Sequence, residues 1–594
     1  MYEPRRYAEW LHSEVFLPVV VVIGSEAAKA RVKEANGLSI AELFAPFGGH
    51  FRGISVSAQS LERQIPIENL RVRYTDADVA QLSTAQADQM AAWTVESSAL
   101  AGKPNNLEPP SPWYEQWRNA LFGSLRWSEH EALDQPTAAL LVVLSKEPDP
   151  VMQLEQLLHA SKMPPLCTQG VLDPVPSRVA VLLHDVSDPE SPSKEDFLKN
   201  LESIRVRFAP NLVLALEINH GGANFLMPEA EDLFKSFLVQ NGPPPPPSAS
   251  DEAKPSPGSR LTREDLQSLA QVGTEVVVKS AVPWMEKQLQ QLEAQISQAR
   301  KGFRNQLKYF WRKPREGAAG ERSDVVEDAA SYPLHSVEGQ MRLAGDLSFH
   351  LRDYEAALSY YRNVVSDFKQ DRSWKHAAGA YEMWGLCAYV TNGARSEWTR
   401  CMESAYEHYL QASTSRLAMR AVALHQAMVS DVKEAALRLM KVNGDLADNN
   451  LKNALILEQA GQLYYASGST RKGAFHLVLA GHTYNKLGFK RLALFSYQAV
   501  VELYLNKGWF HITDHFHFTM ARQAFGLGMK DESLAHFLKL LNSFAESSKK
   551  VCIQAERENT YIKEFIYVMK DWVQTQGAGV DNTIDLQARK SALI

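Results

Sequence analysis

Three residues with reactive side chains follow apolar runs in the first 240 residues. Ser25 follows the run Phe16–Ile23, and His184 and Asp185 follow the run Val179–Leu183. Ligand and active sites often lie at the carboxyl ends of parallel strands, so an enzyme that binds a nucleotide or hydrolyses an ester is one hypothesis. A phosphate-binding loop is incomplete, because GSEAAKA lacks the second glycine and the lysine–hydroxyl pair. No GxSxG motif accompanies His184, and we favour a structural histidine.

Three histidines, His511, His515 and His517, lie close together in WFHITDHFHF. The first two could share one face of a helix, but the HEXXH pattern of zinc enzymes is absent. The cysteines at 167, 387, 401 and 552 form no CxxC pair. We expect histidines packed among aromatic neighbours and reduced thiols of a cytosolic protein, with no catalytic residue, no metal site and no cofactor.

Residues 300–315, RKGFRNQLKYFWRKPR, carry seven positive charges and no acidic residue. Wound as a helix, the segment places an apolar aromatic face beside a basic face, as helices at membrane surfaces do. The predicted membrane-binding residues are Arg300, Lys301, Phe303, Arg304, Leu307, Lys308, Phe310, Trp311, Arg312 and Lys313. Two alternatives stay open, namely aromatic side chains that pack on the rest of the chain and a contact with an acidic partner.

Length and composition place these residues in a large globular protein. The chain has 594 residues, of which 45% are hydrophobic, and a net charge of −6, so we expect two or three domains and no nucleic-acid partner. Its first residues lack a signal-peptide pattern, and its apolar runs are too short to span a bilayer. We expect a cytoplasmic protein that can touch a membrane without crossing it.

Residues 1–240 are predicted to form an α/β domain. Apolar runs at 16–23, 138–144, 179–183 and 212–218 are continuous rather than alternating, which is typical of strands covered on both faces. Helical patterns lie between them, so we expect a mostly parallel sheet with flanking helices. Residues 241–259, with five consecutive prolines, form a Pro/Ser-rich linker. Residues 260–330 form a helical connector that contains the basic segment.

Residues 331–594 are predicted to form an α-solenoid of TPR-like repeats. Two windows superimpose at a distance of 136 residues, four times the ~34-residue period of tetratricopeptide repeats. Small residues in such repeats let two helices approach closely, and an aromatic ring fills the adjoining gap. An irregular helical bundle is the alternative. The matching positions are Gly345, Ala357, Tyr361 and Val364, then Gly481, Ala493, Tyr497 and Val500, with a degenerate third copy at Ala521, Ser533, Phe537 and Leu540.

Several segments resemble one family in the same order along the chain. In the first half they are PWYEQWRNALFGSLRWSEH at 112–130, AALLVVLSKEPDP at 138–150 and VAVLLHDVS at 179–187. In the second half they are residues 332–368, AAGAYEMWGL at 377–386, and residues 471–500 and 508–524. Together they resemble subunit 8 of the TRAPP III (transport protein particle) tethering complex, over about residues 10–545.

The resemblance implies a non-catalytic scaffold subunit of a complex that activates a Rab1-type small GTPase by guanine nucleotide exchange. It implies other TRAPP subunits as partners, the GTPase as an indirect partner, and a possible contact with an anionic membrane. It also implies a peripheral location on Golgi and ER–Golgi intermediate membranes and at autophagosome precursor sites, with roles in ER-to-Golgi vesicle transport and autophagosome formation. An unrelated TPR-type adaptor is a further alternative.

The sequence departs from the family in length. Members of the family are usually much longer and carry a β-rich C-terminal part, whereas this sequence ends at DLQARKSALI. We therefore expect a fragment, an isoform or a truncated form, and functions of the β-rich part are not carried over.

Overall fold

The computed structural model describes residues 3–577 except 50–54, 61–62, 69, 79–82, 103–106, 160–162, 210, 223–224, 242–254, 311–331, 446–449, 505–509 and 548–554. Described contacts divide the chain into two compact units. The first comprises residues 1–90 and 118–428, and the second comprises residues 91–117 and 429–594. The predicted domain limits rest on changes in composition and stay a prediction.

The first unit contains a five-stranded parallel sheet with the order β4-β1-β5-β6-β7. Counted within the sheet alone, this order is 2-1-3-4-5, which is that of flavodoxin-like folds. The strands are β1 (Val19–Gly24), β4 (Arg73–Asp76), β5 (Pro136–Leu144), β6 (Ser177–Asp185) and β7 (Leu212–Ile218), and a separate antiparallel hairpin comprises β2 (Ser55–Ser60) and β3 (Arg63–Glu68). The predicted α/β fold with a parallel sheet is confirmed.

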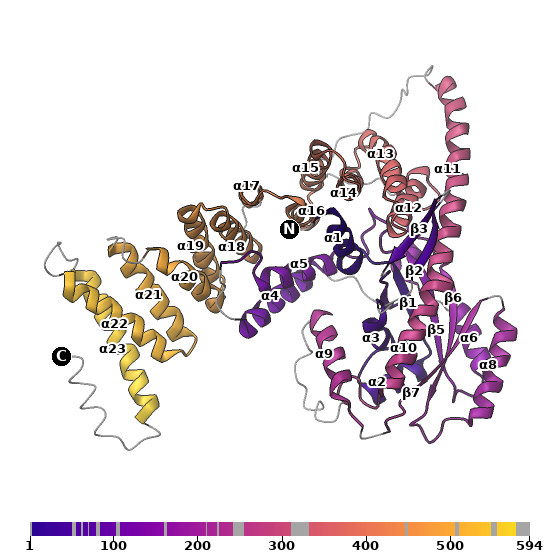
Figure 1. Ribbon diagram of the computed structural model, residues 1–594, viewed down its shortest axis with the longest axis horizontal. Coiled ribbons are helices and arrows are strands. Elements are labelled where there is room, and N and C mark those ends of the chain that lie inside the picture. The colour runs from indigo at the N-terminus through magenta and orange to yellow at the C-terminus, as the bar shows by residue number, and fades with distance from the viewer. Residues whose placement is uncertain are drawn as a thin grey trace, which may run out of the picture. The chain divides into compact units, whose positions relative to one another are not determined.

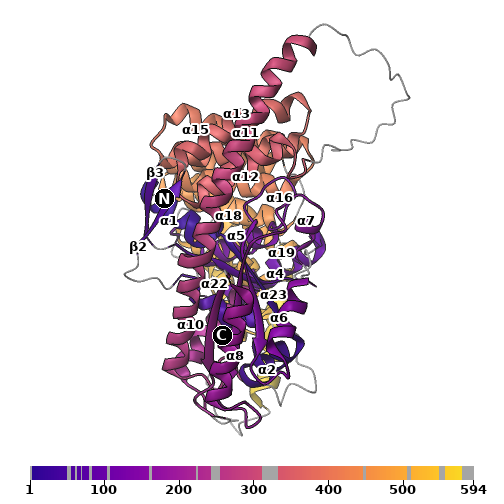
Figure 2. The same ribbon diagram turned by 90° about the vertical axis from the view of Figure 1, so that its right-hand side faces the viewer.

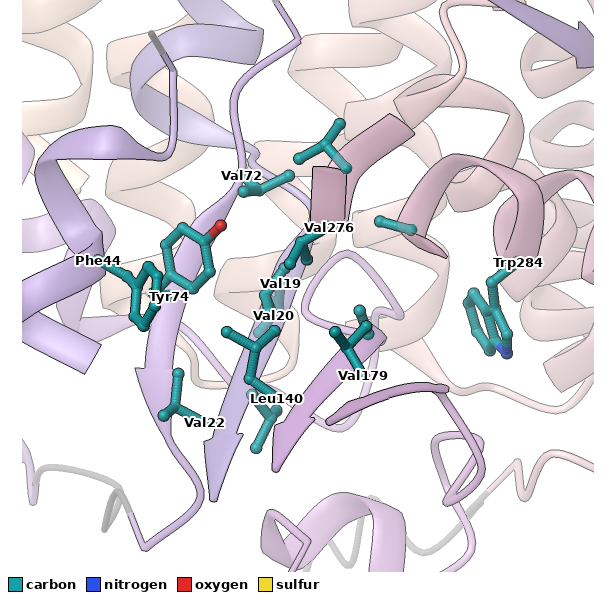
Figure 3. Close-up of a cluster of buried hydrophobic side chains, with 14 of the residues drawn as sticks. Val19, Val20, Val22, Phe44, Val72, Tyr74, Leu140, Val179, Val276 and Trp284 are labelled. Carbon is teal, nitrogen blue, oxygen red and sulfur yellow. The ribbon is translucent and has the colours of Figure 1, made fainter. Parts of the chain in front are cut away.

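The central strands are buried on both faces, as their continuous apolar runs predict. Every residue of β1 and β5 is buried, and Val19, Val20 and Leu140 meet in the core that Figure 3 shows. The same close-up shows Val276 and Trp284, which come from the helices that follow residue 260. These helices therefore belong to the hydrophobic core of the sheet.

Helices cover both faces of this sheet. Helices α6 and α8 pack against each other and on neighbouring strands, as do α3 and α10, and right-handed crossovers place the two pairs on opposite faces. Figure 2 shows α10 and α11 following one another along the sheet. The helices that surround the sheet are α2 (Glu26–Asn36), α3 (Ile40–Phe44), η2 (Ala45–Phe47), α6 (Pro150–His159), α7 (Pro165–Thr168), α8 (Lys194–Phe208), α9 (Pro228–Asn241), α10 (Arg263–Val276), η4 (Val277–Ala281) and α11 (Val282–Phe310).

The rest of the described chain is helical, and within each unit successive repeat helices pack side by side (Figure 1). In the first unit the repeat helices are α12 (Val337–His350), α13 (Tyr354–Gln370), α14 (Trp374–Val390), α15 (Arg395–Gln411) and α16 (Ser415–Met428). In the second they are α17 (Val432–Asp445), α18 (Leu451–Ala466), α19 (Thr470–Lys486), α20 (Lys490–Tyr504), α21 (Phe510–Gly526), α22 (Lys530–Ser547) and α23 (Ala555–Gly577). The predicted helical solenoid is confirmed.

The N-terminal helix and the two helices before β5 complete the fold. They are α1 (Pro4–Trp10), continued by η1 (Leu11–Val15), then α4 (Thr84–Ala101) and α5 (Pro112–Ser124). Helix α1 packs on α14 and α16, where the hydroxyl of Tyr7 donates to the carbonyl oxygen of Leu424 at 3.0 Å. The first residues of the chain thus contact repeat helices.

Close packing at the repeat glycines agrees with the alignment of the two windows. A Cβ added to Gly345 would lie 2.8 Å from the ring of Tyr361, and one added to Gly481 would lie 2.7 Å from the ring of Tyr497. Both distances are shorter than carbon atoms tolerate, so only glycine fits under these tyrosines. The third window is packed likewise, because the Ser533 hydroxyl donates to the Ala521 carbonyl at 2.8 Å and both residues are fully buried.

Ala493, which is fully buried on α20, offers a test of this packing. We expect Ala493→Leu to overfill the helix contact and to lower the free energy of unfolding by ~1–3 kcal/mol. Thermal denaturation followed by circular dichroism measures the change. Ala209→Leu adds the same side chain at an exposed position and should leave the melting temperature unchanged. An unchanged melting temperature in Ala493→Leu would show that this position is not an inter-helix contact.

Candidate functional site

Ser25 lies at the carboxyl end of β1, where the strand order reverses between β4 and β5. In doubly wound folds a ligand binds in the crevice at this switch point. Here the Ser25 hydroxyl caps α2 by accepting from the amide of Ala28 at 3.2 Å, and it donates to Glu147 at 2.5 Å. The same oxygen of Glu147 accepts the amide of Leu144 at 3.0 Å. The chain's own hydrogen bonds therefore occupy the polar groups at this position.

His184 forms a hydrogen bond with a residue that the sequence analysis did not single out. Its Nδ1 atom lies 2.8 Å from the hydroxyl of Ser145, and its ring lies 4.7 Å from the ring of Phe197. Burial lowers the pKa of His184, so the imidazole is neutral at pH 7. A neutral histidine bonded to a serine hydroxyl is the pair that nucleophilic hydrolases use. Ser145, however, is only 2% exposed, so a substrate could reach its hydroxyl only after a local movement.

The carboxylate of Asp185 binds different residues from those that His184 contacts. Its carboxylate accepts from Nε of Arg31 at 2.5 Å and from the hydroxyl of Ser187 at 2.8 Å. Among the described hydrogen bonds, none joins two of the three residues Ser25, His184 and Asp185. The position of Ser145 directly after the run 138–144 is the sequence signal that could have identified it.

Ion pairs extend across the carboxyl edge of the sheet from Asp185. Arg31 lies 3.6 Å from a carboxylate oxygen of Asp188, which also accepts from Lys146 at 2.8 Å. The side chains of Asp185 and Asp188 are 1% and 5% exposed. These pairs connect α2 with the loops that follow β5 and β6, and they fix the edge of the sheet.

A second set of buried charges joins the segment before β5 to repeat helices of the same unit. The guanidinium of Arg420 on α16 donates to both carboxylate oxygens of Glu131, at 2.8 and 2.7 Å. It also donates to Glu382 on α14 at 2.6 Å, and the hydroxyl of Tyr409 on α15 donates to Glu382 at 2.8 Å. The side chains of Arg420, Glu131 and Glu382 are at most 4% exposed.

Asp346 on α12 holds the neighbouring residues of the same segment. Its carboxylate accepts the amide of Ala132 at 2.7 Å, Nε of Arg342 at 2.9 Å and the hydroxyl of Tyr361 at 2.7 Å. Two repeat helices, α12 and α16, thus bind residues 131–132 directly through buried polar contacts, and α14 and α15 join the same set through Glu382 and Tyr409. We name the set Arg420, Glu131, Glu382, Tyr409, Asp346 and Arg342 the buried ionic seam.

A tryptophan anchors the start of α5 within the second unit. Trp113 is 1% exposed, stacks on Phe495 with a centroid distance of 5.8 Å, and donates from Nε1 to Glu458 at 2.7 Å. The hydroxyl of Tyr484 donates to the same oxygen at 2.7 Å. Burial raises the pKa of Glu458 to about 7. The hydrogen bonds from Trp113 and Tyr484 offset the cost of burying the Glu458 carboxylate only in part. Loss of either donor should therefore weaken the contact.

The clustered histidines face different neighbours. His515 lies against His482 with a centroid distance of 5.7 Å, whereas Nδ1 of His517 lies 3.3 Å from that of His536. The side chain of His511 lies outside the described residues. In the described part of the chain no three His, Cys, Asp or Glu residues are placed to hold a metal ion. Three cysteines, Cys167, Cys387 and Cys401, are free and buried, and Cys552 lies outside the described residues.

The predicted membrane-binding segment is described in part. Helix α11 continues to Phe310, so the first part of residues 300–315 is helical, while the side chains from Arg300 onward and all of residues 311–331 lie outside the described residues. The proline run at 243–247 lies outside them as well. Among the helices that the structure describes, none is long and apolar enough to cross a bilayer.

By its architecture the chain belongs to the class of proteins that join a flavodoxin-like α/β domain to TPR-like helical repeats, here through the buried ionic seam. Comparison with known families identifies it more closely. The chain belongs to the family TRAPPC-Trs85, described as the ER-Golgi trafficking TRAPP I complex 85 kDa subunit, which matches residues 13–433. The resemblance found in the sequence is thereby confirmed.

Two relatives show how far the similarity extends. The human "Trafficking protein particle complex subunit 8" is 25% identical over 95% of this chain and 45% of its own length. The "Transport protein particle subunit trs85-1" of Schizosaccharomyces pombe is 20% identical over 65% of this chain and 68% of its own length. This chain therefore spans about half the length of the human relative.

Proposed function

We propose that this chain is a non-catalytic scaffold subunit of a TRAPP complex that activates a Rab1-type GTPase by nucleotide exchange. The observation that carries the proposal is the family match over residues 13–433, which covers the sheet and the first repeat helices together. The buried ionic seam supports this proposal. A rigid connection between the sheet and the repeat helices of the first unit lets the chain hold other subunits at fixed distances. The partners are other TRAPP subunits, and the GTPase is reached through them.

The arrangement of the sheet edge supports a scaffold rather than an enzyme. Ser25 and Asp185 have their polar atoms engaged by Glu147 and Arg31, and Ser145 is buried beside His184. Titration of GTP, ATP and NAD against the purified chain tests the alternative enzyme function. Binding tighter than ~10 μM, about −7 kcal/mol, would favour that alternative.

In this function the chain attaches the exchange-active core subunits to membranes of the early secretory pathway and of forming autophagosomes. Recruitment to vesicles tests the proposal. Purified core subunits should float with anionic vesicles when this chain is present and stay in solution when it is omitted. Equal flotation with and without the chain would contradict the proposed role.

The membrane contact is proposed to lie in residues 300–315. The double substitution Phe303→Asp with Phe310→Asp places two negative charges on the predicted apolar face, and it should abolish flotation of the chain with anionic vesicles. Each basic residue near such a surface contributes ~1 kcal/mol, so raising the salt concentration should weaken binding of the unmodified chain as well.

A matched control variant introduces two aspartates at exposed apolar positions outside residues 300–315. Leu198→Asp with Val206→Asp alters two exposed apolar residues on α8, which are 52% and 75% exposed, and it should leave flotation unchanged. If the Phe303/Phe310 variant is folded and still floats, the segment is not the membrane contact. Loss of folding in that variant would favour aromatic side chains packed on the chain itself.

A further inference from the structure

A cavity of about 420 Å³ lies in the first unit between residues 124–129, which begin at the last residue of α5, and the first turn of α16. Its polar lining is rich in hydroxyl groups, from Thr84, Ser124, Ser128, Ser413, Thr414 and Ser415. Three cationic side chains, Arg126, Lys375 and Arg416, line it together with a single carboxylate, that of Glu129. Lys375 and Glu129 form an ion pair with each other, which leaves the charges of the two arginines.

Arg126 lacks a counter-ion among the described residues. The carboxylate of Asp134 is near enough to attract the charge of Arg126 and so to raise its pKa. Asp134, however, already forms an ion pair with Arg73 and accepts a hydrogen bond from the amide of Trp127 at 2.5 Å. Burial, reinforced by repulsion from Arg73, lowers the pKa of Arg126 to about 9. A half-buried guanidinium without an ion-pair partner is unfavourable, and an anion bound in the cavity would relieve this cost.

Arg416 is only partly satisfied in the same cavity. One terminal nitrogen donates to the hydroxyl of Ser124 at 2.6 Å. Its Nε atom is buried and has no hydrogen-bond partner among the described residues, and the carboxylate of Asp88, on a side chain that is 70% exposed, lies 4.0 Å away. A buried donor without an acceptor is costly, so this atom is available to a ligand oxygen.

The first turn of α16 adds further donors at the same place. The amides at the start of a helix have no intrahelical acceptor, and the positive end of the helix dipole lies there. Thr414, which precedes the helix, directs its hydroxyl to the carbonyl oxygen of Tyr409 at 2.9 Å. Residues 414–417, which form this turn, line the cavity, so their amides can bind an oxyanion there, as helix N-termini do for phosphate groups.

We propose that this cavity binds a phosphorylated polyol, with a phosphate group held by Arg126, Arg416 and the first turn of α16. The volume lies within the ~300–1,000 Å³ of small-molecule sites, so a larger molecule than a single oxyanion fits. The hydroxyls of Ser124, Ser128 and Thr414 bind within the chain. Those of Thr84, Ser413 and Ser415 also line the cavity and can meet the hydroxyls of a polyol ring. Such a group exists as a free inositol phosphate and as the headgroup of a phosphoinositide lipid. This binding activity goes beyond the scaffold function proposed above.

Titration calorimetry on the full chain tests the site with two probes, inositol trisphosphate in solution and phosphatidylcholine vesicles that contain a phosphatidylinositol bisphosphate. Arg126→Gln and Arg416→Gln should each weaken binding at least about tenfold, because each removes a charge-assisted hydrogen bond. Arg205→Gln removes the same charge from an exposed arginine on α8 and should bind like the unmodified chain. Binding of the soluble probe assigns a free inositol phosphate, and binding of the vesicles alone assigns a lipid headgroup when Arg126→Gln and Arg416→Gln weaken it.

The melting temperature without ligand separates a binding role from a structural one. Arg126→Gln removes a half-buried charge that has no ion-pair partner among the described residues, so it should leave this temperature unchanged or raise it, whereas a structural role would lower it. If Arg126→Gln does not fold, Arg416→Gln decides the outcome. Absence of binding to both probes, or equal binding by all variants, would overturn the proposal.

Discussion

Replacing Arg420 with methionine is expected to lower the free energy of unfolding of the first unit by about 3–5 kcal/mol. The substitution leaves the carboxylates of Glu131 and Glu382 buried without the cation that compensates them. Because Glu131 lies before β5 and Glu382 lies on α14, the sheet and the repeat helices should lose stability together. Chemical denaturation followed by circular dichroism, with a trypsin-sensitivity assay of both parts, measures the effect.

Two further variants test whether the effect comes from burial of the ion pair or from the loss of a positive charge alone. Arg263→Met breaks an exposed pair, in which Arg263 lies 3.1 Å from Glu229 and both side chains are about 70% exposed, so it should cost less than ~1 kcal/mol. Adding Glu131→Leu and Glu382→Leu to Arg420→Met removes all the unpaired charges, and it should recover much of the lost stability. A change below ~1 kcal/mol in Arg420→Met itself would show that the seam does not couple the sheet to the helices.

Replacing Trp113 with alanine is expected to destabilise the second unit by about 3–5 kcal/mol. The indole is 1% exposed, so its removal leaves a large cavity beside Phe495. It also removes one of the two donors to the buried carboxylate of Glu458. The start of α5 should then detach from α18 and α20, and hydrogen exchange of these helices followed by mass spectrometry would detect the loss.

Control variants distinguish the cost of the cavity that Trp113→Ala leaves from the cost of losing the hydrogen bond to Glu458. Trp113→Phe keeps a stacked ring and removes only the Nε1 donor, so it should cost about 1–3 kcal/mol. Phe475→Ala truncates an aromatic residue that is 55% exposed in the same unit, and it should have little effect. Equal stability of Trp113→Ala and Phe475→Ala would mean that the α5 anchor contributes nothing to this unit.

The sequence predicts the buried strands well and the polar strands poorly. The runs near 16–23, 138–144, 179–183 and 212–218 correspond to β1, β5, β6 and β7, because strands covered on both faces carry continuous apolar residues. Strand β4, with the sequence RYTD, lies at the edge of the sheet and has no such run. The hairpin strands β2 and β3 are likewise too polar to be recognised by this pattern.

Repeat packing is predictable where glycine and tyrosine recur and harder where other residues replace them. Gly461 and Gly473 are also twelve positions apart and pack against each other, since a Cβ added to Gly473 would lie 2.7 Å from the Gly461 carbonyl oxygen. At the position of the tyrosine this copy has Leu477, which hides it from an aromatic pattern. The spacing of the two glycines is the signal that identifies it.

The polar contacts could not be predicted from a single sequence. Arg420 and Glu131 are 289 positions apart, and neither lies in a motif that marks it as buried. The sequence analysis grouped Ser25, His184 and Asp185 by their places at strand ends, but side-chain geometry gives each of them a different partner. Arg126 and Arg416, which line the proposed phosphate site, likewise meet only through the fold.

Affinity purification of the tagged chain from cells, followed by quantitative mass spectrometry, tests the central claim most directly. The scaffold function predicts that other TRAPP subunits are recovered in constant proportion to the chain. It also predicts that Arg420→Met, which disrupts the connection between the sheet and the helices, reduces their recovery, whereas Arg263→Met does not. Recovery of an unrelated set of proteins without any TRAPP subunit would contradict the claim.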